Sequence, residues 1–142
     1  MRIVSAFFAV LLLSACASGN RHASNVDPAM ASFEAELKGS LTQQTVGELR
    51  KISKFQSGFV YSQFHYQDGK ILDASVVYLA GRKDLAQAVT DQLLRAQVPP
   101  AIPEIAGKRI RFLLGFCFFP SPADCDEYKK RANAAVPPET VP

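Results

Sequence analysis

Residues 58–79 read GFVYSQFHYQDGKILDASVVYL, and this stretch decides the fold. Its two halves are rich in aromatic and β-branched residues, which are typical of strands. Between them lies Gln67-Asp68-Gly69-Lys70, a turn in which Gly69 is free to adopt a positive φ. The segment is therefore predicted to form a β-hairpin. Alternation assigns two core faces: Val60, Ser62, Phe64 and Tyr66 on the first strand, and Leu72, Ala74, Val76 and Tyr78 on the second.

A third strand is predicted over residues 109–119, where large apolar residues alternate strictly with others. One face carries Ile110, Phe112, Leu114, Phe116 and Phe118. The other face carries Arg109, Arg111, Leu113, Gly115 and Cys117. Because its apolar side chains gather on a single face, that face is expected to line the core.

Before the hairpin, apolar residues recur at helical spacing. Asp27-Pro28 is a cap followed by proline at the first helical position, and it predicts a helix over 28–41. The apolar stripe of this helix is Met30, Phe33, Leu37 and Leu41. A second, short helical piece is expected over 48–54, with Leu49 and Ile52 facing inward.

Another helix is predicted between the hairpin and the third strand. Asp84 is expected to cap it, residues 85–96 form it, and prolines 99, 100 and 103 end it. Residues 126–142 begin charged and end rich in proline, so they are predicted to fray. The predicted core is Phe33, Leu37, Val60, Phe64, Val76, Val89, Leu93, Ile110, Phe112, Leu114 and Phe116.

The order helix, hairpin, helix, strand carries a family resemblance over residues 58–119, under half of the chain. The matching positions are Gly58-x-Val60-x-x-x-Phe64-x-Tyr66, Asp68-Gly69-x-Ile71, Gly81, the helix Leu85 to Ala96, Pro99, Gly107 and Ile110-x-Phe112. They resemble the C-terminal domain of TonB-type energy transducers, with TolA as a more distant relative. The resemblance implies an α+β fold with helices packed on one face of a three-stranded antiparallel sheet. It also implies that partners add a strand at the edge formed by the third strand.

The chain also departs from that family. Its transducers begin with an uncleaved helix that couples to a proton-driven motor, and a long Pro- and Lys-rich segment follows that helix. Here Leu79-Ala80-Gly81 replaces the usual Ser-Ser-Gly, and Gln97-Val98-Pro99 replaces aromatic-x-Pro. Force transduction would therefore need a separate, motor-coupled chain, and fold alone does not carry function.

The first residues predict a bacterial lipoprotein signal. Arg2 precedes an apolar run of 11 residues, which is shorter than the roughly 20 needed to span a bilayer. The run ends in Leu13-Ser14-Ala15-Cys16, where small residues allow cleavage and Cys16 accepts the lipid. Residues 1–15 are expected to be removed and residues 16–27 to form a flexible tether. The alternative is an ordinary secretory signal that happens to contain a cysteine.

This signal would place the protein in the cell envelope, lipid-anchored and facing the periplasm. Ala17 follows the cysteine, and in enteric-type sorting that resembles an outer-membrane destination. Lipid on Cys16 leaves Cys117 and Cys125, an even pair in an oxidising compartment, and we expect them to form a disulfide. The alternative, a metal held by Cys117, Cys125 and His65, would be one ligand short.

The sequence contains little that points to catalysis. His22 lies in the tether, and His65 alternates with core residues and should point outward. No nucleophile-elbow or zinc-protease motif occurs, so we expect no enzyme, no cofactor and no metal. A net charge of +3 in small clusters argues against a nucleic-acid partner.

Two functions therefore compete. The first is a membrane-tethered domain that binds a periplasmic or outer-membrane protein or peptide by strand addition along 109–117. Its role would be in TonB-related envelope transport. Its expected partner-binding edge is Arg109, Arg111, Leu113 and Gly115. The second is a structural lipoprotein with a static interface, which would show a broad apolar patch. A blander explanation of the arginines is that charge keeps an exposed edge from aggregating.

Lipidation of Cys16 is directly testable. A palmitate analogue fed to cells should label the wild-type protein, because its short apolar run ends in the acceptor cysteine. Cys16→Ser should take no label. Label on the variant, or an unlabelled wild type, would contradict the lipoprotein assignment.

Overall fold

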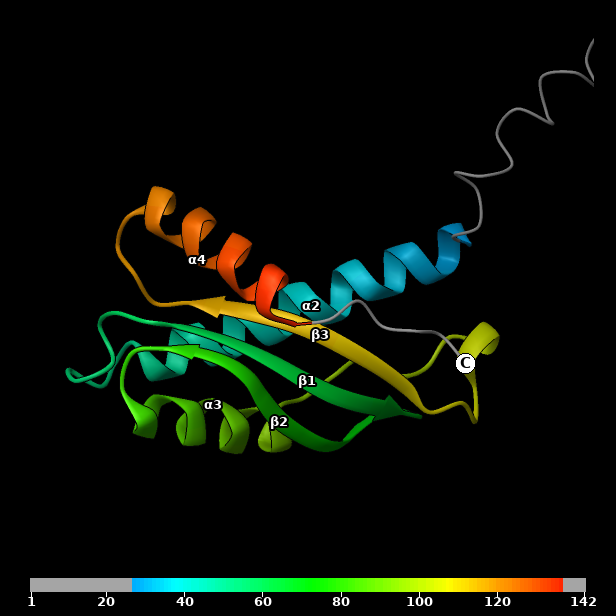
Figure 1. The fold of residues 1–142 in the computed structure, drawn as a ribbon. Coiled ribbons are helices and arrows are strands. Elements are labelled where there is room, and N and C mark those ends of the chain that lie inside the picture. Colours follow the sequence, from blue (N-terminus) through cyan, green and yellow to red (C-terminus); the bar gives the residue numbers. More distant parts are fainter. Residues whose placement is uncertain (1–26, 137–142) are drawn as a thin grey trace, which may run out of the picture.

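A computed structural model describes residues 27–136. The elements are α2 (Pro28–Leu49), β1 (Phe59–Gln67), β2 (Lys70–Ala80), α3 (Lys83–Arg95), the 3-10 turn η3 (Pro103–Ile105), β3 (Ile110–Cys117) and α4 (Pro122–Ala135), as drawn in Figure 1. The strands form one antiparallel sheet in the order β2-β1-β3, so the first strand is central. The α+β fold with a three-stranded antiparallel sheet is therefore as predicted.

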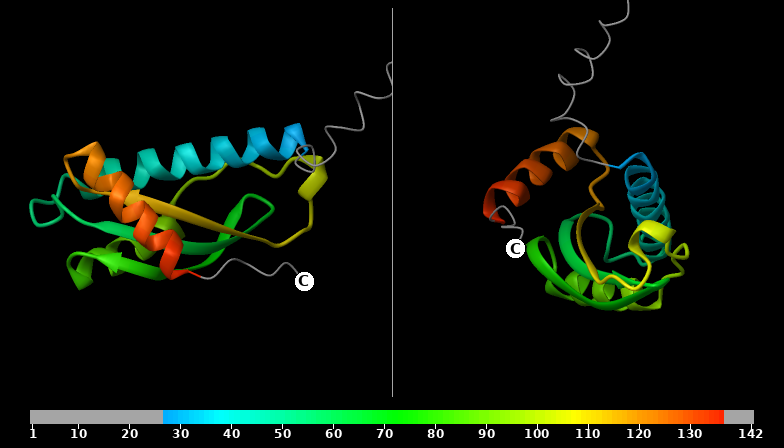
Figure 2. Two further views of the ribbon diagram at one scale, coloured as in Figure 1. Left: turned by 45° about the horizontal axis from the view of Figure 1, so that its top comes forward. Right: turned by 90° about the vertical axis from the view of Figure 1, so that its right-hand side faces the viewer.

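The sheet is covered on two sides. Helices α2 and α3 contact the strands and each other on the face that carries the main core. Helix α4 contacts β1 and β2, and Figure 2 shows it on the other side of the sheet from α2 and α3. This third helix was not expected, because residues 126–135 were predicted to belong to a frayed tail. Their helix is attached at its start by a disulfide, which sequence periodicity does not reveal.

The hairpin turn is as predicted. Asp68 and Gly69 have φ values of 45° and 82°, which is the two-residue turn whose twist suits a hairpin. The β1–β2 register, however, shifts between Tyr61 and Ser62 and again between His65 and Tyr66. Each shift is a bulge that adds a residue to β2 and reverses its alternation.

The bulges correct the predicted core face of β2. Ala74 and Val76 pack against the core as expected, but Leu72 is 44% exposed and Tyr78 contacts the ring of Phe59 on the opposite face. The prediction was wrong at Leu72 and Tyr78, because one extra residue exchanges the two faces of a strand. The residues of β2 that pack against the core are Ile71, Ala74, Val76 and Leu79.

The first helix is longer than predicted. It begins with the expected cap, in which the Asp27 carboxylate accepts from the Ala29 N–H at 2.8 Å, and it continues to Leu49. The separate helical piece over 48–54 is therefore wrong. Thr45 and Leu49 extend the buried stripe by two turns, and burial of this stripe outweighs the roughly 1 kcal/mol cost of an internal glycine. Ile52, predicted to face inward, lies in the turn after the helix and is 40% exposed.

The start of α3 also differs. The N-cap is Arg82, and Asp84 lies inside the first turn rather than at the cap. Its carboxylate pairs with Arg82 Nε at 2.9 Å and with Lys54 Nζ at 3.0 Å. Hydrogen bonds from Arg82 and Lys54 lower the pKa of Asp84 to about 2. The carboxylate thus joins α3 to the turn after α2 instead of capping the helix.

The predicted core is present. Buried members are Phe33, Leu37, Val60, Phe64, Val89, Leu93, Phe112 and Phe116, and the partly buried ones that pack against them are Val76, Ile110 and Leu114. The sequence pattern did not predict the burial of Phe55, Phe59 and Ile105, which lie at the ends of elements or in loops. Their burial depends on which segments the fold brings beside them.

Truncating single side chains of β3 to alanine tests this assignment of faces. Phe112 is buried between the rings of Phe64, at 5.6 Å, and Tyr66, at 6.5 Å. Phe112→Ala should therefore lower the free energy of unfolding by about 3–5 kcal/mol. Leu113→Ala, on the partly exposed face, should cost much less. Equal losses in chemical denaturation would contradict the register of β3.

Candidate binding edge

The register of β3 determines which of its backbone N–H and C=O groups point outward from the sheet edge. The Phe118 N–H donates to the Gly58 carbonyl at 2.7 Å, and the register pairs Phe116 with Val60 and Leu114 with Ser62. In an antiparallel ladder, hydrogen-bonded and non-hydrogen-bonded pairs alternate. Even-numbered residues of β3 therefore turn their backbone groups toward β1, and odd-numbered residues turn theirs away. The outward positions include Leu113 and Gly115.

The two edges of the sheet are not equivalent. β2 carries two bulges, which twist a strand and interrupt the regular row of donors and acceptors that another strand would need. β3 pairs with β1 over eight consecutive residue pairs, Ile110 to Cys117, without a shift. Within residues 27–136, no further strand lies beside it. β3 is therefore the regular edge of this sheet.

A pocket of about 300 Å³ lies beside this edge. Its walls come from four elements: Lys38 on α2, Phe59 and Tyr61 on β1, Leu113 to Gly115 and Cys117 on β3, and Cys125, Asp126 and Lys129 on α4. Figure 2 shows α4 crossing the end of β3 while α2 runs beside the strand. The pocket therefore exists only because α4 folds over the sheet, and sequence reasoning did not find it.

Gly115 shapes the floor of this pocket. A Cβ atom added at Gly115 would lie 2.6 Å from Cζ of Phe59, so the ring lies directly over the glycine. The same ring contacts Tyr61 and Tyr78, with centroids 6.5 Å apart in each case. A glycine inside a strand often marks a close approach of another group. That signal was available in the sequence, although the partner of Gly115 was not.

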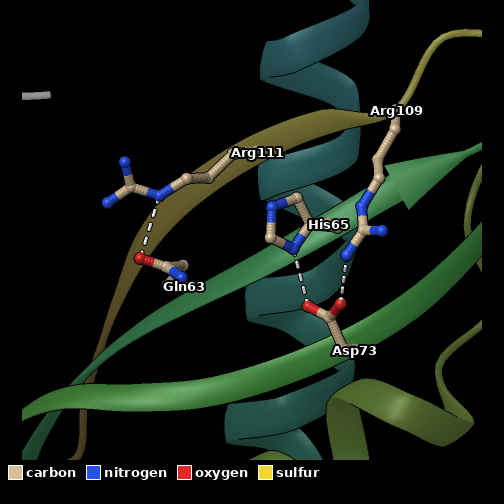
Figure 3. Close-up of polar contacts among 5 residues, drawn as sticks. All are labelled: Gln63, His65, Asp73, Arg109 and Arg111. Carbon is tan, nitrogen blue, oxygen red and sulfur yellow. Dashed lines mark hydrogen bonds and ion pairs between the residues drawn. The ribbon is translucent and has the colours of Figure 1, made fainter. Parts of the chain in front are cut away.

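The two predicted arginines lie on the sheet face outside the core, as Figure 3 shows. Arg109 donates to Asp73 Oδ2 on β2 at 2.8 Å, and the other oxygen of Asp73 lies 2.7 Å from His65 Nδ1. Arg111 Nε donates to Gln63 Oε1 on β1 at 2.9 Å. The hydrogen bond with His65, together with the positive charge of Arg109, lowers the pKa of Asp73.

This polar cluster joins all three strands at the hairpin end of the sheet. Both arginine side chains bind acceptors on neighbouring strands, so they extend across the sheet rather than outward from its edge. Asp73 therefore offsets the charge of Arg109, whereas the Nε of Arg111 donates to a neutral amide. His65 points away from the core, as predicted, and it is held by Asp73. The part of the predicted edge that adjoins the pocket is Leu113 and Gly115.

The cysteine prediction is confirmed where the structure describes it. Cys117 and Cys125 form a disulfide with Cα atoms 5.7 Å apart, which excludes the alternative of a metal held by both thiolates. Residues 27–136 contain no cluster of three or more histidine, cysteine or acidic side chains suited to a metal ion. Cys16, His22, the predicted signal and the predicted tether up to residue 26 lie outside the described residues, while Asp27 caps α2. No helix within the described residues is long and apolar enough to cross a membrane.

Comparison with known proteins adds no assignment. No family model, curated protein or solved structure matches this chain. The resemblance to TonB-type C-terminal domains therefore remains an interpretation of the residues themselves.

The disulfide should hold α4 on the sheet. The one buried residue of α4 is Ala132. Apart from the disulfide, α4 is held by Tyr128, whose ring stacks on Phe119 with centroids 4.7 Å apart. Replacing both cysteines by serine should lower the free energy of unfolding by about 2–3 kcal/mol, as expected for opening so short a loop. Intact-mass measurement without reduction should show the wild type two hydrogens lighter than its reduced form. Two freely alkylated thiols in the native protein would contradict the bond.

Proposed function

We propose that this protein is a lipid-anchored envelope protein whose domain binds a periplasmic or outer-membrane partner by strand addition at β3. The observation that carries the proposal is the regular edge of β3, whose outward backbone positions at Leu113 and Gly115 also line a pocket. Main-chain hydrogen bonds supply the affinity in this mode of recognition, and pockets for alternate side chains supply the specificity. The anchoring rests on the lipoprotein signal around Cys16.

The distribution of apolar surface supports strand addition over a static interface. The exposed large apolar residues of the described chain are Ile52, Leu72, Val77 and Leu94. They lie on a turn, on β2 and on α3, and none of them lies on β3 or α4. Strand addition at β3 needs no exposed apolar patch, whereas a static interface there would be expected to need a broad one. The structural lipoprotein is thus the weaker alternative.

The site chemistry also favours binding over catalysis. Cys117 and Cys125 are bonded to each other, and both oxygens of Asp73 are engaged by His65 and Arg109. We therefore propose a non-enzymatic role without cofactor. The small, partly paired basic groups support a protein partner more than a nucleic acid, whose binding calls for a continuous basic face.

A proline at Leu113 tests strand addition. This residue forms a non-hydrogen-bonded pair with Gln63, so proline removes an outward donor and leaves the β1–β3 ladder bonds in place. Leu113→Pro should abolish capture of partners from solubilised envelope membranes. Circular dichroism and thermal unfolding would verify that the variant is folded.

Two matched variants separate the backbone from the side chains. Leu113→Ala keeps the N–H and should retain most of the capture, while Arg111→Ala should weaken it mildly and in a salt-dependent way. If a folded Leu113→Pro protein captured the same partners as the wild type, strand addition would be wrong. The static lipoprotein would then become the better explanation.

A further inference from the structure

We infer that the pocket between β3 and α4 receives one apolar or aromatic side chain of the added strand and selects acidic residues near it. This inference rests on the proposed function and names the chemistry of its partner: an extended peptide with an apolar residue between carboxylates. The argument uses the register of β3, the walls of the pocket and the charges at its rim.

The register determines which side chains of a partner would enter. Residues directly opposite each other in paired strands place their side chains on the same face of a sheet. Gly115 pairs with Tyr61, and both lie on the face that α4 covers. A partner residue opposite Gly115 would therefore project toward α4. Its side chain would enter the pocket beside the ring of Phe59, which covers Gly115 and forms part of the pocket wall.

The walls of the pocket suit an apolar group. Phe59 and Tyr61 form one side, Leu113 and Leu114 lie along the strand, and the disulfide closes the end. The volume of about 300 Å³ is at the lower limit of the roughly 300–1,000 Å³ found for ligand pockets. A site of this size fits a single large side chain better than a cofactor.

The charges at the rim select the neighbours of that side chain. Lys38 on α2 and Lys129 on α4 line the pocket, and Asp126 is its one acidic residue. Lys38 forms an ion pair with Glu34, in which the ammonium lies 3.7 Å from the carboxylate. Lys129 is exposed on α4. The two lysines come from helices on opposite sides of the sheet, so they flank a strand that approaches between them. Carboxylates on that strand complement this arrangement.

Three fluorescent peptides test the inference with the full chain purified in detergent. The first is Thr-Glu-Thr-Phe-Thr-Glu-Thr; the second has Ser in place of Phe, and the third has Lys in place of both Glu residues. Fluorescence anisotropy should show the first binding most tightly. Loss of the phenyl group should weaken binding about ten- to a hundredfold, because its burial is lost. Amide resonances of Gly115 and Phe59 should shift on binding.

Charge reversal on α4 supplies the matched control. Lys129→Glu should weaken the Phe/Glu peptide by about two- to fivefold and strengthen the Phe/Lys peptide. Lys130→Glu makes the same charge change at an adjacent exposed residue that does not line the pocket, so it should change neither affinity. Equal effects of the two variants would show a general charge effect and overturn the selection of acidic neighbours.

The remaining outcomes distinguish the pocket from strand addition. If all three peptides bound equally and Leu113→Pro abolished their binding, the role of the pocket would be wrong and strand addition would stand. Phe-dependent binding that survives Leu113→Pro would overturn strand addition instead. If no peptide showed saturable binding, the inference would be overturned. Self-association of the chain that blocks Gly115 would also overturn it, because the occupant of the pocket would then be a second copy of this chain.

Discussion

The unshifted pairing of β1 with β3 is the interaction on which the rest of the structure depends. Eight consecutive pairs hold the two strands in one register, and that register places Phe112 and Phe116 in the core. The same register sets Gly115 beneath the ring of Phe59 and brings Cys117 to the end of the strand, within reach of Cys125. A slip by one residue would exchange all of these positions, because strand side chains alternate with a period of two. The core, the pocket and the attachment of α4 therefore share one determinant.

The central strand buries residues on both of its faces, and the two faces are stabilised differently. Toward α2 and α3, β1 contributes Val60, Phe64 and Tyr66 to a continuous apolar core. Toward α4, the apolar cluster is small, and Phe59 is its buried member. A helix with so little buried surface of its own gains most from a covalent attachment. The disulfide supplies this attachment and also forms the end wall of the pocket.

The difference between the two sheet edges connects the fold with the proposed function. β2 has two bulges and a polar cluster around Asp73, and both features discourage another strand from pairing there. β3 keeps a regular backbone and adjoins the pocket. An added strand would thus meet repeated donors and acceptors together with one specific recess. This combination is what a module that binds extended peptides requires.

The sequence by itself determined the elements whose signal is local. The hairpin turn at Asp68-Gly69, the apolar face of β3 and the cap at Asp27 follow from turn chemistry, alternation and side-chain hydrogen bonding within a few residues. The pairing of Cys117 with Cys125 followed from counting the cysteines. Only the tertiary structure decided which face Leu72 and Tyr78 take, since bulges arise from pairing between strands. It also decided that α4 forms and that a pocket lies beneath it, because these depend on contacts between segments far apart in the chain.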